Sequence, residues 1–289
     1  MQLSIAVGAM TFYPLDTTLA IARDAGARYV ELLLTRRMCA NGGGRLEERA
    51  RAAGVTVITA HAVLAFRPQP LAAKIASDVA SIETAAKIES CGAIVLHPPS
   101  TENGTASDVV RWLDAIAEAR KRARPTLDLA IENPAMNWDG LPTQWLESVE
   151  TLSAVAGEWH IRVCLDLAHA ASFGLHLVRT IDSLAPRLAN VHLSDANQRR
   201  FRGGLLNGLF RDHALPGSGT LPLDDALAAL IARDYRGPLT LEFSPASLQA
   251  WLPGAPRRRL RTAVGDVRQR LVRLAAEATT PIPHPHRTQ

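Results

Sequence analysis

The sequence predicts an α/β protein whose single domain, residues 1–276, folds as a (β/α)8 TIM barrel. Short apolar runs alternate with longer amphipathic segments along the chain, which is the pattern of parallel strands joined by helices. A doubly wound open sheet would carry a Gly-rich phosphate loop after its first strand, but "VGAMTFYPLD" at 7–16 lacks the GxGxxG spacing. The 289 residues, 47% of them apolar, suffice for one large core. Residues 277–289, rich in Pro and poor in apolar residues, predict a disordered tail with two histidines.

Eight strands are expected where Val, Ile and Leu gather in short runs with little interruption. Continuous apolar character of this kind is typical of strands that are buried on both faces of a parallel sheet. The expected strands are Leu3–Val7, Tyr29–Leu34, Val55–Ala60, Ala93–His97, Leu127–Glu132, Ile161–Asp166, Leu188–Leu193 and Pro238–Glu242.

The amphipathic segments between these strands predict helices. They are Asp16–Ala25, Arg45–Ala53, Leu71–Ser90, Ala106–Ala123, Thr143–Ala156, Leu175–Leu184 and Leu223–Arg233, followed by a final Arg-rich helix near 255–276. Gly26 and Gly54 each follow a helix and precede a strand, where a C-terminal helix cap belongs. "NGGGR" at 41–45 follows the second strand and is interpreted as a mobile loop.

The charge balance and the cysteines narrow the function classes only slightly. Lys and Arg number 32 against 28 Asp and Glu, and the resulting charge of +4 permits an anionic partner without requiring one. Cys39, Cys91 and Cys164 are odd in number and widely spaced, which favours reduced thiols in a cytoplasmic protein. The chain shows neither a signal-peptide pattern nor an apolar run of membrane-spanning length, so no membrane partner is expected.

The expected strands end in residues that can carry chemistry. In a barrel of this type the carboxyl ends of all strands meet at one mouth, where active sites lie. Any single His, Asp or Glu there has an ordinary structural explanation, such as a helix cap. Strands three to eight, however, end one after another in His61, His97, Glu132, Asp166, His192 and Glu242.

Carboxylates gathered in an apolar mouth repel one another and lose hydration, so a cation is expected to hold them. A divalent metal bound by imidazole and carboxylate groups meets this need directly. Asp166 is then a ligand at a strand tip. His169, three residues later, is a second ligand or a supporting group that the following loop brings alongside.

Six short motifs occur in order along the chain. They are "VEL" at 30–32, "IENP" at 131–134, "CLDLAH" at 164–169, "VHLSDA" at 191–196, "HALPGSG" at 213–219 and "LEF" at 241–243. With this order and spacing, the chain resembles the xylose-isomerase-like TIM barrel superfamily over about residues 3–245. That superfamily contains sugar isomerases and epimerases, including sugar phosphate isomerases, related dehydratases, and abasic-site DNA endonucleases of the endonuclease IV type.

The resemblance implies a shared metal site that is made by Glu132, Asp166, His192 and Glu242. It also implies that Glu132 and Glu242 form an acid/base pair, which removes a proton next to a carbonyl on one face and returns it from another side. The cofactor implied is a divalent metal, namely Zn, Mn, Mg or Co.

The endonucleases of this superfamily bind additional zinc ions. His61 and His97 match the two histidines of one additional site, and His169 and His213 match those of another. That second site also needs an Asp two residues before the loop histidine, but Arg211 stands there and Asp212 comes one residue late. A cation in place of a metal-binding carboxylate opposes a third metal.

The favoured function is therefore a divalent-metal-dependent isomerase or epimerase of a sugar, keto-sugar or related polyol. His61, His97 and His169 would contact substrate oxygens, and a phosphate or carboxylate would be held by Arg199, Arg200, Arg202 or Arg211. Two alternatives stay open: an endonuclease IV-like zinc phosphodiesterase on abasic DNA, and a keto-polyol dehydratase. A small-molecule substrate is the expected partner, nucleic acid is the less favoured one, and a homo-oligomer is compatible with the sequence.

Overall fold

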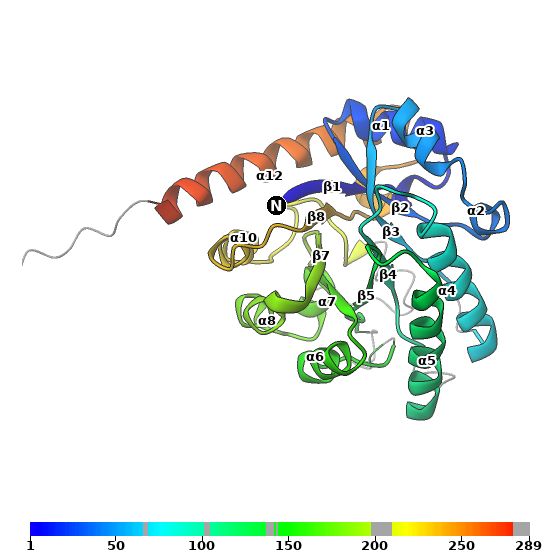
Figure 1. Cartoon of the computed structure of the whole chain (residues 1–289). Coiled ribbons are helices and arrows are strands. Elements are labelled where there is room, and N and C mark those ends of the chain that lie inside the picture. The colour runs from blue at the N-terminus through cyan, green and yellow to red at the C-terminus, as the bar shows by residue number, and fades with distance from the viewer. Residues whose placement is uncertain (66–68, 101–104, 137–141, 143, 198–209, 280–289) are drawn as a thin grey trace, which may run out of the picture.

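In the computed structural model, eight parallel strands close into a barrel in the order β1-β2-β3-β4-β5-β6-β7-β8 (Figure 1). This confirms the (β/α)8 prediction. The structure describes the whole chain except residues 66–68, 101–104, 137–141, 143, 198–209 and 280–289. The strands are β1 (Gln2–Ala6), β2 (Tyr29–Leu33), β3 (Thr56–His61), β4 (Ala93–Leu96), β5 (Asp128–Glu132), β6 (Arg162–Asp166), β7 (Leu188–Leu193) and β8 (Pro238–Leu241).

Helices surround the strands, and the long α12 packs on α10 and α1 (Figure 1). The longer helices are α1 (Leu15–Asp24), α3 (Leu46–Ala52), α4 (Leu71–Ala85), α5 (Ala106–Arg122), α6 (Val149–Glu158), α8 (Leu177–Leu184), α10 (Leu223–Ala232) and α12 (Ala255–Thr279). The short ones are η1 (Gly8–Met10), α2 (Arg36–Ala40), α7 (Leu167–Ser172), η2 (Ala185–Arg187) and α11 (Pro245–Leu248). Among the described residues, no helix is both long enough and apolar enough to cross a bilayer.

Several element boundaries differ from the prediction. The helix that was expected from Thr143, a residue outside the described ones, begins at Val149, because the Ser148 side chain accepts a hydrogen bond from the Thr151 amide and caps it. The final helix α12 runs to Thr279, three residues into the segment that was assigned to the tail; the rest of the tail lies outside the described residues.

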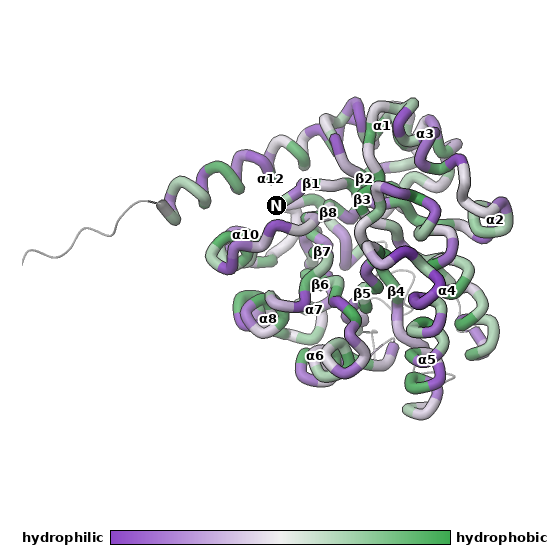
Figure 2. The backbone as a smooth tube through the Cα atoms, viewed as in Figure 1, coloured by the Kyte–Doolittle hydropathy of each residue, from purple (hydrophilic) through white to green (hydrophobic). Residues whose placement is uncertain are grey.

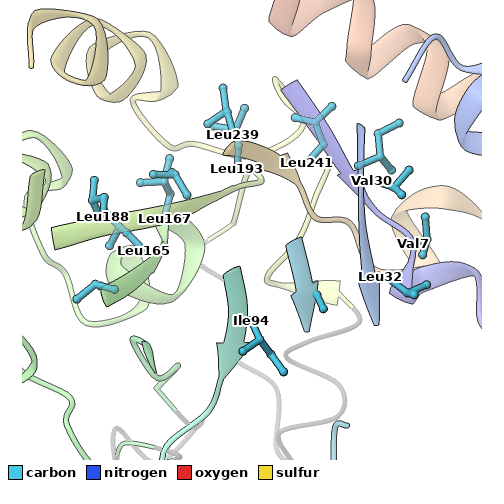
Figure 3. Close-up of a cluster of buried hydrophobic side chains, with 14 of the residues drawn as sticks. Val7, Val30, Leu32, Ile94, Leu165, Leu167, Leu188, Leu193, Leu239 and Leu241 are labelled. Atoms are coloured by element: carbon cyan, nitrogen blue, oxygen red, sulfur yellow. The ribbon is translucent and has the colours of Figure 1, made fainter. Parts of the chain in front are cut away.

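One side of the strands is apolar, and the other carries both apolar residues such as Val95, Ala130 and Cys164 and buried polar ones, which the expected continuous apolar pattern did not distinguish. Alternate positions such as Val30, Leu165 and Leu239 belong to the main hydrophobic core (Figure 3). Along α12, hydrophobic and hydrophilic residues are interspersed (Figure 2), and buried positions such as Leu260, Ala263, Val264 and Val267 recur every three to four residues, as on one face of a helix. The remaining strand positions include buried polar residues, namely Ser4, Glu31, Thr59, Asn190 and Thr240.

A contact between strands that are not neighbours shows where these polar residues lie. Asn190 on β7 donates from Nδ2 to Oε2 of Glu31 on β2 at 2.8 Å, although β8 and β1 separate the two strands in the closed sheet. Such a contact must cross the inside of the barrel. The lumen is therefore polar just below the mouth.

A buried carboxylate fixes the loop that follows β7. Asp195 accepts hydrogen bonds from four backbone amides, those of Ala196, Gly217, Gly219 and Leu221, at 2.9–3.0 Å. Residues 214–221 are thereby held against the end of β7, next to His213. A Cβ on Gly219 would overlap the backbone oxygen of Ala196 and Oδ1 of Asp195, so only glycine fits there.

We predict that Gly219→Ala breaks this arrangement. The Asp195 carboxylate would lose buried donors, and each unsatisfied group costs about 1–3 kcal/mol of unfolding free energy. Chemical denaturation measures this loss. Gly265→Ala in α12 is the matched control, because a Cβ there meets nothing within 4 Å; it should be neutral or stabilising by up to about 1 kcal/mol. Equal stability of the two variants would contradict the role given to Asp195.

Candidate functional site

Four side chains meet at the mouth of the barrel, one from each of the ends of β5, β6, β7 and β8. They are Glu132, Asp166, His192 and Glu242, and their ligand atoms all lie within 4.8 Å of one another. Nδ1 of His192 lies 2.8 Å from Oε2 of Glu242, 3.3 Å from Oε1 of Glu132 and 3.9 Å from Oδ2 of Asp166. The ring nitrogen and three carboxylates thus face one point.

The strand register explains this convergence. Asp166 is paired with His192 across β6 and β7, and His192 with Thr240 across β7 and β8. Glu242 is the first residue after β8, and its amide donates to the Leu193 carbonyl at 3.2 Å, which continues the pairing. Glu132 pairs with Cys164, two residues before Asp166, so the four residues follow one another around the carboxyl ends of adjacent strands.

Asn133 and helix α7 orient Asp166. The Asn133 side chain accepts from the Asp166 amide at 2.7 Å and donates to the Asp166 carbonyl at 3.0 Å. Oδ1 of Asp166 caps α7 by accepting from the His169 amide at 2.6 Å. The predicted loop after β6 is thus a short helix, and Oδ2 of Asp166 is left to point at the other carboxylates.

The histidines determine the ionisation of two of the carboxylates. Burial opposes ionisation of Glu132, yet the charges of His97 and His192 bring its pKa well below the usual range. Burial also opposes ionisation of Glu242, and the charges of His192 and His213 lower its pKa. Both glutamates are therefore carboxylates at neutral pH.

The donor set fits a divalent cation. Burial raises the pKa of Asp166, and the neighbouring Glu132 and Glu242 charges add to this, although His169 and His213 act against it. Oδ2 of Asp166 and Oε2 of Glu242 have no hydrogen-bond partner among the described residues. Carboxylate oxygens without a hydrogen-bond donor can bind a cation, and three carboxylates with one imidazole are ligands that Zn, Mn and Co accept.

His61 and His97 lie on the other side of Glu132. Their Nε2 atoms are 3.3 Å and 2.8 Å from Oε2 of Glu132, and the three residues form a second group that could hold a metal. Nδ1 of His61 lies 2.9 Å from the Ala62 carbonyl, which can only accept, so Nδ1 carries a proton and Nε2 faces the carboxylate.

His169 and His213 stand beside Asp166 and form a third group with it. Nδ1 of His169 lies 3.0 Å from the Asn133 carbonyl. His213 has a positive φ of 57°, and its carbonyl accepts from the Ser244 amide at 2.9 Å, so the loop holds it in a backbone conformation that is rare outside glycine. The structure thus brings together all eight predicted Glu, Asp and His residues.

The predicted arginines are placed differently. Arg199, Arg200 and Arg202 lie outside the described residues. Arg211 is 4% exposed; its guanidinium donates to both carboxylate oxygens of Asp212 at 2.6–2.7 Å and to the Met136 carbonyl at 2.9 Å. Substrate binding by Arg211 stays a prediction, and it requires the Arg211–Asp212 ion pair to open. The same ion pair engages the Asp212 carboxylate, which was considered as a ligand for a third metal.

Sequence reasoning missed the residues that support the ligands. Asn133 lies in the "IENP" motif and Glu31 in "VEL", so both motifs were noticed without a role for these side chains. Glu31 is 1% exposed, and its Oε1 lies 3.0 Å from Nε2 of His192. The signal available in the sequence was an acidic residue in the middle of an otherwise apolar strand.

A family model described as "Xylose isomerase-like TIM barrel" matches residues 19–264 of the chain. The chain belongs to the xylose isomerase-like TIM barrel family. The resemblance inferred from the motifs is thereby confirmed, and the matched residues include Glu132, Asp166, His192 and Glu242.

Among curated proteins, the Streptomyces coelicolor protein named "Putative hydroxypyruvate isomerase" is 28% identical over 114 residues. The match covers 38% of this chain and 36% of that protein, so the chain spans little more than a third of the relative's length.

Solved structures of the same fold include L-ribulose 3-epimerase, with a TM-score of 0.73, 18% identity and coverage of 98% of this chain and 99% of that one. D-psicose 3-epimerase from Clostridium cellulolyticum H10, solved with D-tagatose, has a TM-score of 0.68 and 14% identity over 94% and 99% of the chains. The IOLI protein with a bound zinc atom has a TM-score of 0.70 and 17% identity over 97% and 100%. With the family match, these relatives support the class of sugar isomerases and epimerases in general.

We predict that a divalent metal stabilises this member of the xylose isomerase-like family. An ion at a hundred times its dissociation constant adds about 2.7 kcal/mol to the unfolding free energy if the unfolded chain does not bind it. Thermal unfolding with Mn²⁺ or Zn²⁺ against a chelator measures the shift. Asp166→Asn should lose most of it, whereas Asp234→Asn, on the exposed surface, should keep it. A shift of equal size in the two variants would place the ion elsewhere.

Proposed function

We propose that this protein is a divalent-metal-dependent isomerase or epimerase of a sugar, keto-sugar or related polyol. The observation that carries the proposal is the pair Glu132 and Glu242, whose carboxylates approach one point from β5 and β8 with Asp166 and His192 between them. Both pKa values lie below the usual range, so either glutamate can accept a proton at neutral pH.

The two glutamates differ in access. Glu132 is buried behind His61 and His97, whereas the Glu242 side chain is 22% exposed at the mouth. In the proposed reaction, one carboxylate removes the proton next to the substrate carbonyl, and an enediolate results. The other glutamate, after it has taken up a proton from solvent, gives that proton to the enediolate from a different side, which inverts the carbon or moves the carbonyl.

The metal, held by Glu132, Asp166, His192 and Glu242, would supply positive charge for the substrate oxygens when bound. His97, with a side chain 24% exposed, and His169 border the same space and would donate hydrogen bonds to hydroxyl groups. Arg199, Arg200 or Arg202 would hold a phosphate or carboxylate if the substrate carries one.

Relatives point to the same chemistry. Their names and titles describe epimerases that act on ketoses, one of them solved with D-tagatose, and an isomerase of hydroxypyruvate. All of these substrates have a carbonyl next to a carbon that bears a hydroxyl group. This chemistry suits an acid/base pair beside a metal.

The second candidate is a zinc phosphodiesterase on abasic DNA. The groups His61–His97–Glu132 and Asp166–His169–His213 favour it, because they offer room for further metals beside the central one. The Arg211–Asp212 ion pair weighs against the phosphodiesterase. Arg211 stands two residues before His213 of the third group, and its guanidinium engages the Asp212 carboxylate that a third metal would need.

The deciding experiment incubates the metal-loaded protein with a panel of keto-sugars in D2O. The proposal predicts that deuterium enters the carbon next to the carbonyl and that Glu242→Gln lowers this exchange by about 10²- to 10⁴-fold. Glu118→Gln, on the exposed face of α5, is the control and should catalyse deuterium incorporation into the sugar at the wild-type rate.

Other products would identify the alternatives. Loss of water from the sugar would indicate the dehydratase. Nicking of abasic DNA without deuterium exchange would overturn the proposal in favour of the endonuclease. Full exchange activity in Glu242→Gln would overturn the acid/base role given to the glutamates.

A further inference from the structure

Below the metal-binding residues, a chain of polar contacts crosses the lumen of the barrel. Thr240 Oγ1 on β8 donates to Asn190 Oδ1 at 2.9 Å. Asn190 Nδ2 donates to Oε2 of Glu31 at 2.8 Å. The other carboxylate oxygen of Glu31 lies 3.0 Å from Nε2 of His192. Both atoms are buried, and neither has a hydrogen bond of standard geometry to the described residues, so each is the nearest available partner of the other.

The direction of each contact follows from its neighbour. Thr240 donates to the amide oxygen of Asn190, which turns the amide nitrogen toward Glu31. As a carboxylate, Glu31 offers only acceptors. An acceptor facing Nε2 of His192 favours a proton on that nitrogen, so a metal that binds would displace the proton on Nδ1 and leave the one on Nε2 in place.

Nδ1 is the nitrogen that faces Glu132, Asp166 and Glu242. A proton there would block it as a ligand, whereas a proton on Nε2 leaves it free. Metal-ligating histidines generally need such a partner on their second nitrogen, and its loss costs about 10- to 100-fold in metal affinity.

We propose that Glu31 is a positioning residue that, with Asn190 and Thr240, keeps the proton of His192 on Nε2 and so prepares Nδ1 for the metal. The inference rests on the metal site of the proposed function. It assigns a task to three buried polar residues that take no part in the acid/base chemistry, and it explains an acidic side chain in the middle of β2.

Glu31→Gln tests which atom donates at each contact between Thr240 and His192, because it replaces one acceptor oxygen by a donor with almost no change in size. Asn190 still points its amide nitrogen at residue 31, so the new side chain keeps its oxygen there and turns its own amide nitrogen toward His192. Nε2 must then accept, and the proton moves to Nδ1. We expect Zn²⁺ affinity, measured by competition with a chelator, to fall about 10- to 100-fold.

The double variant Glu31→Gln with Asn190→Asp places an acceptor opposite Nε2 of His192 again. The new carboxylate at 190 accepts from Thr240 and from the amide nitrogen of residue 31, whose oxygen again faces Nε2 of His192. We expect Zn²⁺ affinity to return to within a few-fold of the wild-type value. A loss of packing alone would not be repaired by the second substitution.

Glu31→Asp is the control for charge. It keeps the negative charge but shortens the side chain, so it cannot reach both Asn190 and His192, and Zn²⁺ affinity should fall here too. Unchanged affinity in Glu31→Gln, wild-type affinity in Glu31→Asp, or no recovery in the double variant would each overturn the inference. Failure of the wild-type protein to bind Zn²⁺ would instead overturn the metal site itself.

Discussion

The crowding of three carboxylates at one buried point is the constraint on which the barrel mouth depends. Glu132 and Asp166, both buried, come within ligand distance of the partly exposed Glu242, and like charges this close repel one another. Protons on the surrounding histidines offset part of this charge. A divalent cation held by all three carboxylates and the neutral His192, as we propose, would offset it more fully.

The barrel supplies the rigidity that such crowding requires. Adjacent parallel strands bring the candidate ligands to one end of the barrel, and buried hydrogen bonds fix the groups around them: Asn133 on Asp166 and Asp195 on the loop of His213. Glu31 lies 3.0 Å from His192 on its other side. These contacts reach the ligands from strands and loops that the fold already holds in place. A site of this kind is prepared for its ion and substrate before either binds.

The eight strands and most helices were predictable because apolar runs and amphipathic segments are local features of the sequence. The convergence of the candidate ligands was predictable because the carboxyl ends of all strands meet at one mouth of the barrel; that they bind a metal stays a prediction. Glu31, Asn190 and Thr240 were not, since their contacts join β2, β7 and β8 across the lumen and no local pattern reveals them. The pairing of Arg211 with Asp212 likewise depends on how a loop folds back against Met136.

The proposed function depends most directly on whether the four residues at the ends of β5 to β8 bind one divalent ion. Native mass spectrometry of protein purified without chelator measures the number of ions per chain directly. The account predicts one ion in the wild-type protein and none in Asp166→Asn. Wild-type protein without any ion after incubation with Zn²⁺ or Mn²⁺ would contradict the claim, and two or three zinc ions per chain would favour the phosphodiesterase over the isomerase.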